Sequence, residues 1–171
     1  MAIDGCEHSF SDLATTVLPA HFARLEEAMN HPWKASRFSE SRQGPASLAK
    51  DLELASDFSG CYVLLDGKTA VYVGISRKVL HRLRQHMLGK DHFAASLAYA
   101  MAKKGHTLPL GTRKKSMQDV NFADAFKASQ EYLRGLSVAA VAIENPLELY
   151  VFEAYAAMEL GTAEWNTFRT H

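Results

Sequence analysis

The sequence predicts an α/β fold of the α+β type, with a small three-stranded antiparallel sheet flanked by helices. Two short apolar runs rich in β-branched and aromatic residues, 61–65 and 70–73, flank an Asp-Gly-Lys-Thr loop typical of a β-hairpin. A third such run, 137–143, ends at a Glu-Asn-Pro turn signal. The segments around these runs repeat their apolar residues at helical spacing, which predicts the flanking helices.

Residues 1–56 form a predicted N-terminal extension that is mostly helical, and residues 57–171 form the main domain. From Phe10 to Met29 the apolar residues recur at helical spacing, although Pro19 must begin or break a helix there. We expect the extension to pack over the sheet. An arm that contacts substrate or forms a dimer is the alternative.

A helix is predicted after Gly74, with Ser76 placed to cap it. Arg82 and His86, four residues apart, lie at the edge of its apolar face, which is formed by Val79, Leu80, Leu83 and Met87. A side chain at such an edge is held by packing and still reaches a cleft. An isolated Arg–His pair on a helix is more often a surface pair.

Residues 89–117 are expected to form a helix–loop insertion. Its helix is predicted over 91–104, and its loop ends in Arg113, Lys114 and Lys115. Clustered lysines and arginines neutralise phosphates without reading bases, so this loop is a candidate for binding the DNA backbone. A plain solvent-exposed connector explains the loop equally well.

The last predicted helix, 147–160, is apolar in almost every direction and is therefore expected to be buried. Glu148 and Glu159 project to the same side, while Glu153 lies among apolar neighbours. An ionised acid left unpaired in such a place costs several kcal/mol. Glu153 should therefore have a cation partner, which is either a protein side chain or a metal ion.

Charge is unevenly distributed in a chain whose formal net charge is zero. Between residues 76 and 115, ten lysines and arginines are opposed by one aspartate, Asp91. A segregated positive stretch attracts phosphates locally even in a neutral protein. Solvated helix faces are the alternative explanation of such a stretch.

Composition also excludes several classes of protein. No run of about 18 apolar residues is present, so no membrane span is expected. The N-terminus lacks the basic and apolar sections of a signal peptide, and the two cysteines do not suggest a disulfide framework. We therefore expect a cytoplasmic protein. No histidine and cysteine spacing indicates structural zinc.

The motif Gly60-Cys61-Tyr62, then Tyr72-Val73-Gly74, resembles the two tripeptides of the GIY-YIG nuclease superfamily. The other matching positions, in order along the chain, are Arg82, His86, Glu153 and Asn166. The resemblance covers about residues 60–168. The chain differs from the family pattern in its cysteine within the first tripeptide and in the longer interval between the histidine and the glutamate.

The resemblance implies a GIY-YIG-like fold and a metal-dependent endonuclease that hydrolyses phosphodiester bonds in DNA. In this reading, Glu153 binds Mg²⁺ or Mn²⁺ and Arg82 contacts the scissile phosphate. Tyr62 is the expected general base, sharing the proton with His86, and Tyr72 positions or assists. The remaining family position, the asparagine at 166, would help to order the site.

Nucleic-acid contacts are expected from one glycine and six basic residues in addition to the motif residues: Gly74, Arg77, Lys78, Arg84, Arg113, Lys114 and Lys115. A non-catalytic nucleic-acid-binding module of the same fold and an RNA-directed nuclease are the alternatives. One domain has one active site, so cutting both strands requires a homodimer, sequential nicking or a second nuclease.

Overall fold

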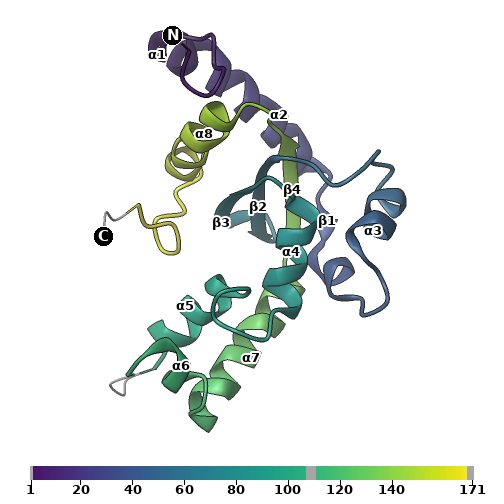
Figure 1. The fold of residues 1–171 in the computed structure, drawn as a ribbon, viewed down its shortest axis with the longest axis vertical. Coiled ribbons are helices and arrows are strands. Elements are labelled where there is room, and N and C mark those ends of the chain that lie inside the picture. Colours follow the sequence, from purple (N-terminus) through teal and green to yellow (C-terminus); the bar gives the residue numbers. More distant parts are fainter. Residues whose placement is uncertain (1, 107–110, 169–171) are drawn as a thin grey trace.

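A four-stranded antiparallel sheet lies at the centre of the computed structural model, which describes residues 2–106 and 111–168 (Figure 1). Its strands are β1 (Trp33–Lys34), β2 (Gly60–Asp66), β3 (Thr69–Ser76) and β4 (Ser137–Ala142), in the order β1-β4-β2-β3. The α+β class is as predicted, and the three expected strands are present. The expected number of three is wrong by one, because β1 adds a short strand beside β4. Two residues are too few to show strand alternation in a sequence.

Strands β2 and β3 form the predicted hairpin, and its register brings the two motif tyrosines to the same face. Tyr62 pairs with Gly74, and Leu64 pairs with Tyr72. The two tyrosines are therefore diagonal neighbours across the strands, within reach of aromatic side chains. The register shifts between Leu64 and Leu65, and Gly67 takes a positive φ of 59° in the turn.

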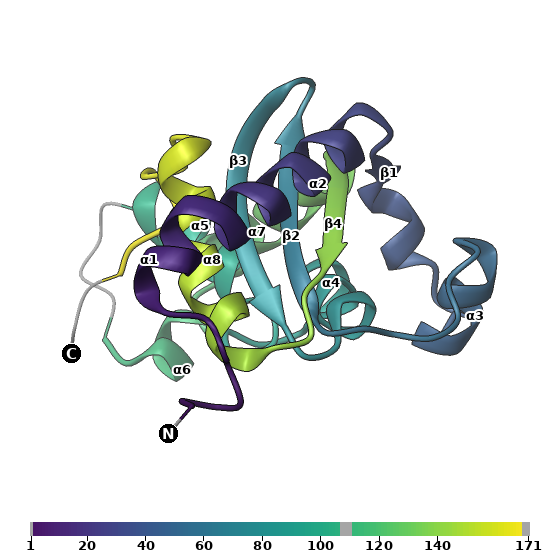
Figure 2. The same cartoon turned by 90° about the horizontal axis from the view of Figure 1, so that it is seen from above.

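Helices cover both faces of the sheet, which gives three layers (Figure 2). Helices α2 and α8 pack on one face, and α4 packs on the other, with α5 and α7 beside it. The main helices are α2 (Leu18–Asn30), α4 (Val79–Leu88), α5 (Ser96–Lys104), α7 (Val120–Gly135) and α8 (Pro146–Glu159). Shorter ones are α1 (Phe10–Asp12), α3 (Pro45–Asp51), α6 (Arg113–Ser116) and a 3₁₀ turn, η2 (Ala35–Ser39).

Strand β2 is buried on both faces because helices pack on each side of it. Cys61, Val63 and Leu65 belong to the core shared with α2 and α8. Tyr62 and Leu64 belong to the core shared with α4, α5 and α7. A strand covered on both sides reads as a continuous apolar run, which is how this segment appears in the sequence.

The first part of the N-terminal extension is one helical rod from Phe10 to Asn30 that contains a π-helical turn, η1 (Leu13–Val17). Pro19 lies at the start of α2. Proline has no N–H and clashes with the carbonyl four residues before it, and the wider π turn avoids both problems. Pro19 therefore alters the helix locally without ending it. The rod packs on β4 and α8 through Leu18 and Leu25.

The N-terminus of helix α4 is capped by a residue that precedes the β2–β3 hairpin in the chain. Asp57 accepts hydrogen bonds from the backbone N–H groups of Leu80, at 2.8 Å, and His81, at 3.0 Å. Ser76, the expected cap, instead accepts from the N–H of Lys78 just before the helix. A carboxylate at a helix N-terminus satisfies free donors and interacts well with the helix dipole.

The 89–117 segment is helical in part. Helix α5 begins at Ser96, later than expected, because Asp91 accepts from the N–H groups of Phe93 and Ala94 and so forms a turn. The basic end of the predicted loop is the short helix α6, capped by Thr112. Residues 107–110 of that loop lie outside the described residues.

A search of the helices in the described ranges, 2–106 and 111–168, finds none that is both long and apolar enough to cross a bilayer.

Replacing Asp57 with alanine should destabilise the protein by about 1–2 kcal/mol, because two N–H groups of α4 lose their acceptor. Urea unfolding measures this change. Asp124→Ala, an exposed change within α7, should alter the free energy of unfolding by less than about 0.5 kcal/mol. A loss for Asp57→Ala no larger than that of the control would contradict the capping role.

Candidate functional site

The side chains of Tyr62 and His86 meet in the layer between the sheet and α4. The Tyr62 hydroxyl lies 2.7 Å from Nε2 of His86. Tyr62 is 1% exposed and His86 is fully buried. The bond therefore links the central strand β2 to α4 in a region without water contact.

Tyr72 packs on this pair and is itself only half-buried. Its ring centroid lies 6.3 Å from that of Tyr62 and 6.0 Å from that of His86. Because β3 is at the edge of the sheet, the Tyr72 side chain is the member of the aromatic group that reaches the surface. The resemblance predicted both tyrosines and the histidine in one site, and the fold brings all three together.

Arg82 is held beside the aromatic group by the start of the insertion. Its Nη1 donates to the side-chain oxygen of Gln85 and to the carbonyl of Ala94, and its Nη2 donates to Oγ of Ser96. A guanidinium has five N–H donors, so these three bonds fix its plane, and of the remaining donors one interacts with the Tyr62 hydroxyl. The proximity of this charge lowers the pKa of His86 and acts to lower the pKa of both tyrosines.

Glu153 approaches β3 from the opposite layer, on α8. Burial raises the pKa of this half-buried carboxyl. Within residues 2–106 and 111–168, no lysine, arginine or histidine nitrogen lies within 4 Å of its oxygens. Its negative charge acts to raise the pKa of Tyr72 and of Cys61, which places the carboxylate close to both strands of the hairpin.

Tyr72 is thus the residue on which two opposite charges act. Burial raises its pKa most, Glu153 raises it further, and Arg82 opposes both, so that the net pKa is above the usual 10.0. A positive group on the α4 side and a negative group on the α8 side therefore flank one accessible phenol. Such an arrangement of charges around a proton-transfer group is typical of functional sites.

The Tyr62–His86 pair is neutral at neutral pH. Burial, followed by the charge of Tyr72, raises the pKa of Tyr62 well above its ordinary value. Burial and then Arg82 lower the pKa of His86 to about 3. Among the described residues, Nδ1 of His86 has no hydrogen-bond partner. This burial does not favour Tyr62 as the group that meets a reacting water, which was its predicted role.

Gly74 has a packing role that the sequence did not indicate. A Cβ atom at this position would lie 2.4 Å from both Cζ and the hydroxyl oxygen of Tyr62, and 2.9 Å from Cε1 of Tyr72. Real Cβ atoms do not approach other atoms so closely. The glycine therefore makes room for the phenol of its cross-strand partner.

Asn166 holds the outer edge of β3 by pairing with one residue. Its Oδ1 accepts from the N–H of Val73 at 2.9 Å, and its Nδ2 donates to the Val73 carbonyl at 2.8 Å. An edge strand leaves such groups unpaired, and this side chain takes the place of a further strand. Asn166 therefore positions the strand that carries Tyr72 and does not itself reach the phenols.

The six basic residues predicted to bind nucleic acid differ in what they contact. Arg77, Lys78, Lys114 and Lys115 are exposed and available to a partner. Arg84 instead donates to the carbonyls of Phe38, at 3.5 Å, and Glu40, at 3.0 Å, so it ties α4 to the N-terminal extension. Arg113 is exposed but stacks over the ring of Tyr99, 5.5 Å from its centroid.

The donor set around Glu153 determines which metal ion would fit. In the described part of the chain, no three His, Cys, Asp or Glu side chains are grouped so that they could hold an ion. Zinc is normally held by three or four such ligands. One free carboxylate is instead suited to a hard ion that keeps several waters, such as Mg²⁺ or Mn²⁺.

Sequence analysis missed Ser96 and the Ala94 carbonyl, which orient the Arg82 guanidinium. Neither carries a local signal, because a serine at the start of a helix is common and any residue supplies a carbonyl. Asp57, which caps α4 and so fixes its direction, was missed for the same reason.

Gly74→Ala should disrupt the packing of Tyr62 against this position. The free energy of unfolding should fall by several kcal/mol, because neither the ring of Tyr62 nor the strand can move freely in a dense core. Gly135→Ala is the matched control, since a Cβ there meets nothing within 4 Å. Thermal unfolding compares the two. Equal melting temperatures would contradict the close approach.

Protonation of His86 should make stability depend on pH. Its pKa is lowered from 6.5 to about 3 by folding, so between these values the unfolded chain binds a proton that the folded chain does not. Stability is therefore kept above pH 6.5 and lost as pH falls toward 3. Relative to His86→Gln, the wild type should lose about 2 kcal/mol between pH 7 and pH 5. Urea unfolding at the two pH values measures the difference, and parallel behaviour of the two proteins would contradict a neutral buried imidazole.

Comparison of the chain with models of known protein families, with curated proteins and with solved structures finds no match. The likeness to the GIY-YIG superfamily therefore rests on the sequence pattern of the six residues named above.

Proposed function

We propose that this protein is a metal-dependent endonuclease that hydrolyses phosphodiester bonds in DNA. The observation that carries the proposal is the placement of Glu153, a half-buried acid without a protein cation within 4 Å in the described ranges, beside a phenol that faces Arg82 from its other side. Leaving such a charge unpaired destabilises a fold unless a ligand compensates it. The position of Glu153 is therefore explained better by ligand binding than by a contribution to the stability of the fold.

Arg82 is assigned to the scissile phosphate. Its planar guanidinium suits paired phosphate oxygens, and a donor fixed before binding loses little entropy on binding. The three bonds to Gln85, Ala94 and Ser96 provide that fixation, and the substrate is assigned the donor that bonds neither these acceptors nor Tyr62.

Glu153 is assigned to one divalent ion, Mg²⁺ or Mn²⁺. Such an ion, when bound, supplies positive charge to the phosphoryl oxygens and orients water. With its charge compensated, Glu153 no longer raises the pKa of Tyr72, while Arg82 continues to lower it. The phenol of Tyr72 then becomes a stronger acid, and its phenolate a more available base at neutral pH.

Tyr72 is assigned to the proton of the attacking water, because it is the accessible tyrosine of the pair. Water oxygen adds to phosphorus, its proton passes to the phenolate, and the bond to the leaving oxygen breaks as that oxygen gains a proton from solvent. Tyr62 and His86 lie behind Tyr72 and hold its ring through packing. Their hydrogen bond makes them positioning residues.

Contacts along the rest of the DNA are assigned to the exposed basic residues. Arg77 and Lys78 follow directly after β3 and so lie near Tyr72 in the chain. Lys114 and Lys115 lie on α6, in the insertion. Their contacts are to phosphates and carry no sequence information.

A non-catalytic nucleic-acid-binding module is the second candidate, and one observation favours it. Arg82 already uses three donors on protein acceptors, as a structural arginine does. The two candidates differ in what Glu153 does. A binding module has no use for an acid close to the phosphate, whereas a nuclease requires one.

Glu153→Gln separates the two candidates when cleavage and stability are measured together. Plasmid, single-stranded and branched DNA and a single-stranded RNA are incubated with protein and Mg²⁺ or chelator. Loss of the metal ligand should lower cleavage by about 100-fold or more. The free energy of unfolding should stay the same or rise, because a buried uncompensated charge is removed.

Glu159→Gln is the control, since Glu159 is exposed on the same helix. It should change neither property. Binding of DNA without metal-dependent cleavage by the wild type would instead establish the binding module. Cleavage of RNA alone would reassign the substrate.

A further inference from the structure

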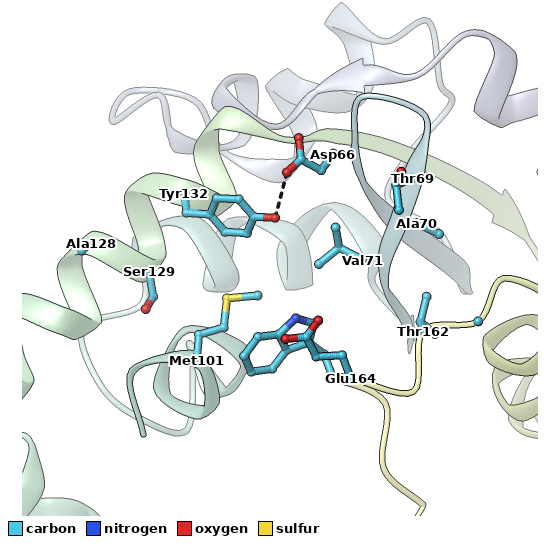
Figure 3. Close-up of a pocket in the computed structure, with 12 residues that line it drawn as sticks. Asp66, Thr69, Ala70, Val71, Met101, Ala128, Ser129, Tyr132, Thr162 and Glu164 are labelled. Carbon is cyan, nitrogen blue, oxygen red and sulfur yellow. Dashed lines mark hydrogen bonds between the residues drawn. The ribbon is translucent and has the colours of Figure 1, made fainter. Parts of the chain in front are cut away.

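Beside the proposed site, a cavity of about 740 Å³ lies between the β2–β3 hairpin, α5, α7 and the C-terminal segment (Figure 3). Its size is that of small-molecule sites in proteins. Tyr132 and Met101 face each other across it, and Val71 points into it from β3. Trp165 also lines it. These side chains supply the apolar part of a mixed lining, and the Tyr132 ring offers a surface on which a flat ring system can stack.

The polar groups of the cavity are mainly hydrogen-bond acceptors. Asp66 and Glu164 both line it, and ionised carboxylates accept only. Two of the donors nearby already bond these carboxylates. Tyr132 donates to Oδ2 of Asp66 at 3.1 Å, and Lys104 donates to Oε1 of Glu164 at 2.8 Å. One oxygen of each carboxylate has no such bond, so the cavity is suited to a ligand with donors.

The cavity and the proposed site share two elements. Strand β3 supplies Val71 to the cavity and Tyr72, the next residue, to the site. Helix α5 supplies Met101 to the cavity, and its first residue, Ser96, holds Arg82. These two positions on α5 are about 7–8 Å apart along the helix axis. The same DNA strand can therefore occupy both.

Charge determines which part of a nucleotide fits the cavity. Glu164 is paired with Lys104, but the carboxylate of Asp66 has no cation partner within 4 Å in the described ranges and repels phosphates, which disfavours the DNA backbone at this position. A base removed from the stack is flat, uncharged and read along its Watson–Crick edge. Guanine presents two adjacent donors on that edge, N1–H and the N2 amine. One can bond the free oxygen of Asp66, and the other the remaining lone pair of Oδ2, which already accepts from Tyr132. Thymine presents a single donor between two carbonyl groups.

We propose that this cavity binds a guanine base extruded from the DNA next to the scissile phosphate, with Asp66 accepting from its Watson–Crick edge. This inference rests on the proposed nuclease function. Tyr132 orients Asp66 through its hydroxyl and provides a stacking surface. The cavity therefore gives the nuclease a preference for guanine beside the cut.

The test replaces each guanine near the mapped cut by inosine, which lacks the N2 amine, and measures single-turnover cleavage with Mg²⁺. At one position, inosine should slow the wild type by about tenfold, the usual effect of a lost bond to a charged group. Asp66→Asn should show less than about a twofold difference at that position. Asp124→Asn, an exposed change on α7 outside the cavity, should discriminate like the wild type.

Two outcomes of this test overturn the inference and leave the nuclease proposal intact. In the first, no inosine substitution changes the cleavage rate by more than twofold. In the second, Asp66→Asn discriminates between guanine and inosine as strongly as the wild type does. A wild type that cuts no DNA overturns the proposed function instead. In that case, binding of guanosine monophosphate to the protein is measured by tryptophan fluorescence, with thymidine monophosphate as the control. Binding of the guanine nucleotide alone, lost in Asp66→Asn, assigns the cavity to free nucleotides, and no binding leaves it without a base ligand.

Discussion

The hydrogen bond between Tyr62 and His86 determines how α4 lies on the sheet, and the candidate site depends on it. The bond joins strand β2 to the last turn of α4 where neither side chain meets water, so its loss would leave two buried polar groups unpaired. One turn before His86 on the same helix, Arg82 is thereby directed toward the two tyrosines. Gly74 allows the approach, because any larger residue would occupy the space of the Tyr62 phenol.

Tyr72 lies where two charges from opposite layers of the fold act on one phenol. Arg82 comes from α4 and Glu153 from α8, and β3 is the edge strand between them. Asn166 keeps this strand in place by bonding both backbone groups of Val73. An edge strand is the only place in such a sheet where side chains from both faces come near the same solvent-exposed point. The position of β3 in the sheet therefore explains why a site is possible there, and the cavity lined by Val71 continues along the same edge.

Sequence analysis predicted the parts of this arrangement that have local signals. The hairpin, the amphipathic helix with Arg82 and His86, and the unusual position of Glu153 all follow from periodicity and turn residues. The parts it missed depend on contacts between distant segments. Strand β1 is two residues long, Asp57 caps a helix 23 residues away, and Ser96 holds Arg82 across 14 residues. The exposure of Tyr72 and the burial of Tyr62 also follow from the tertiary fold, because two tyrosines on one hairpin look alike in a sequence.

We propose that Glu153, the acid beside Tyr72, binds a divalent ion. Nuclear magnetic resonance of protein labelled at its six tyrosine rings tests this claim when Mn²⁺ is added, because the ion broadens signals of nearby nuclei. We expect Tyr72, assigned with Tyr72→Phe, to broaden before Tyr99, and we expect Glu153→Gln to abolish the effect. Equal broadening of the two residues, or broadening that persists in Glu153→Gln, would contradict a metal site at Glu153.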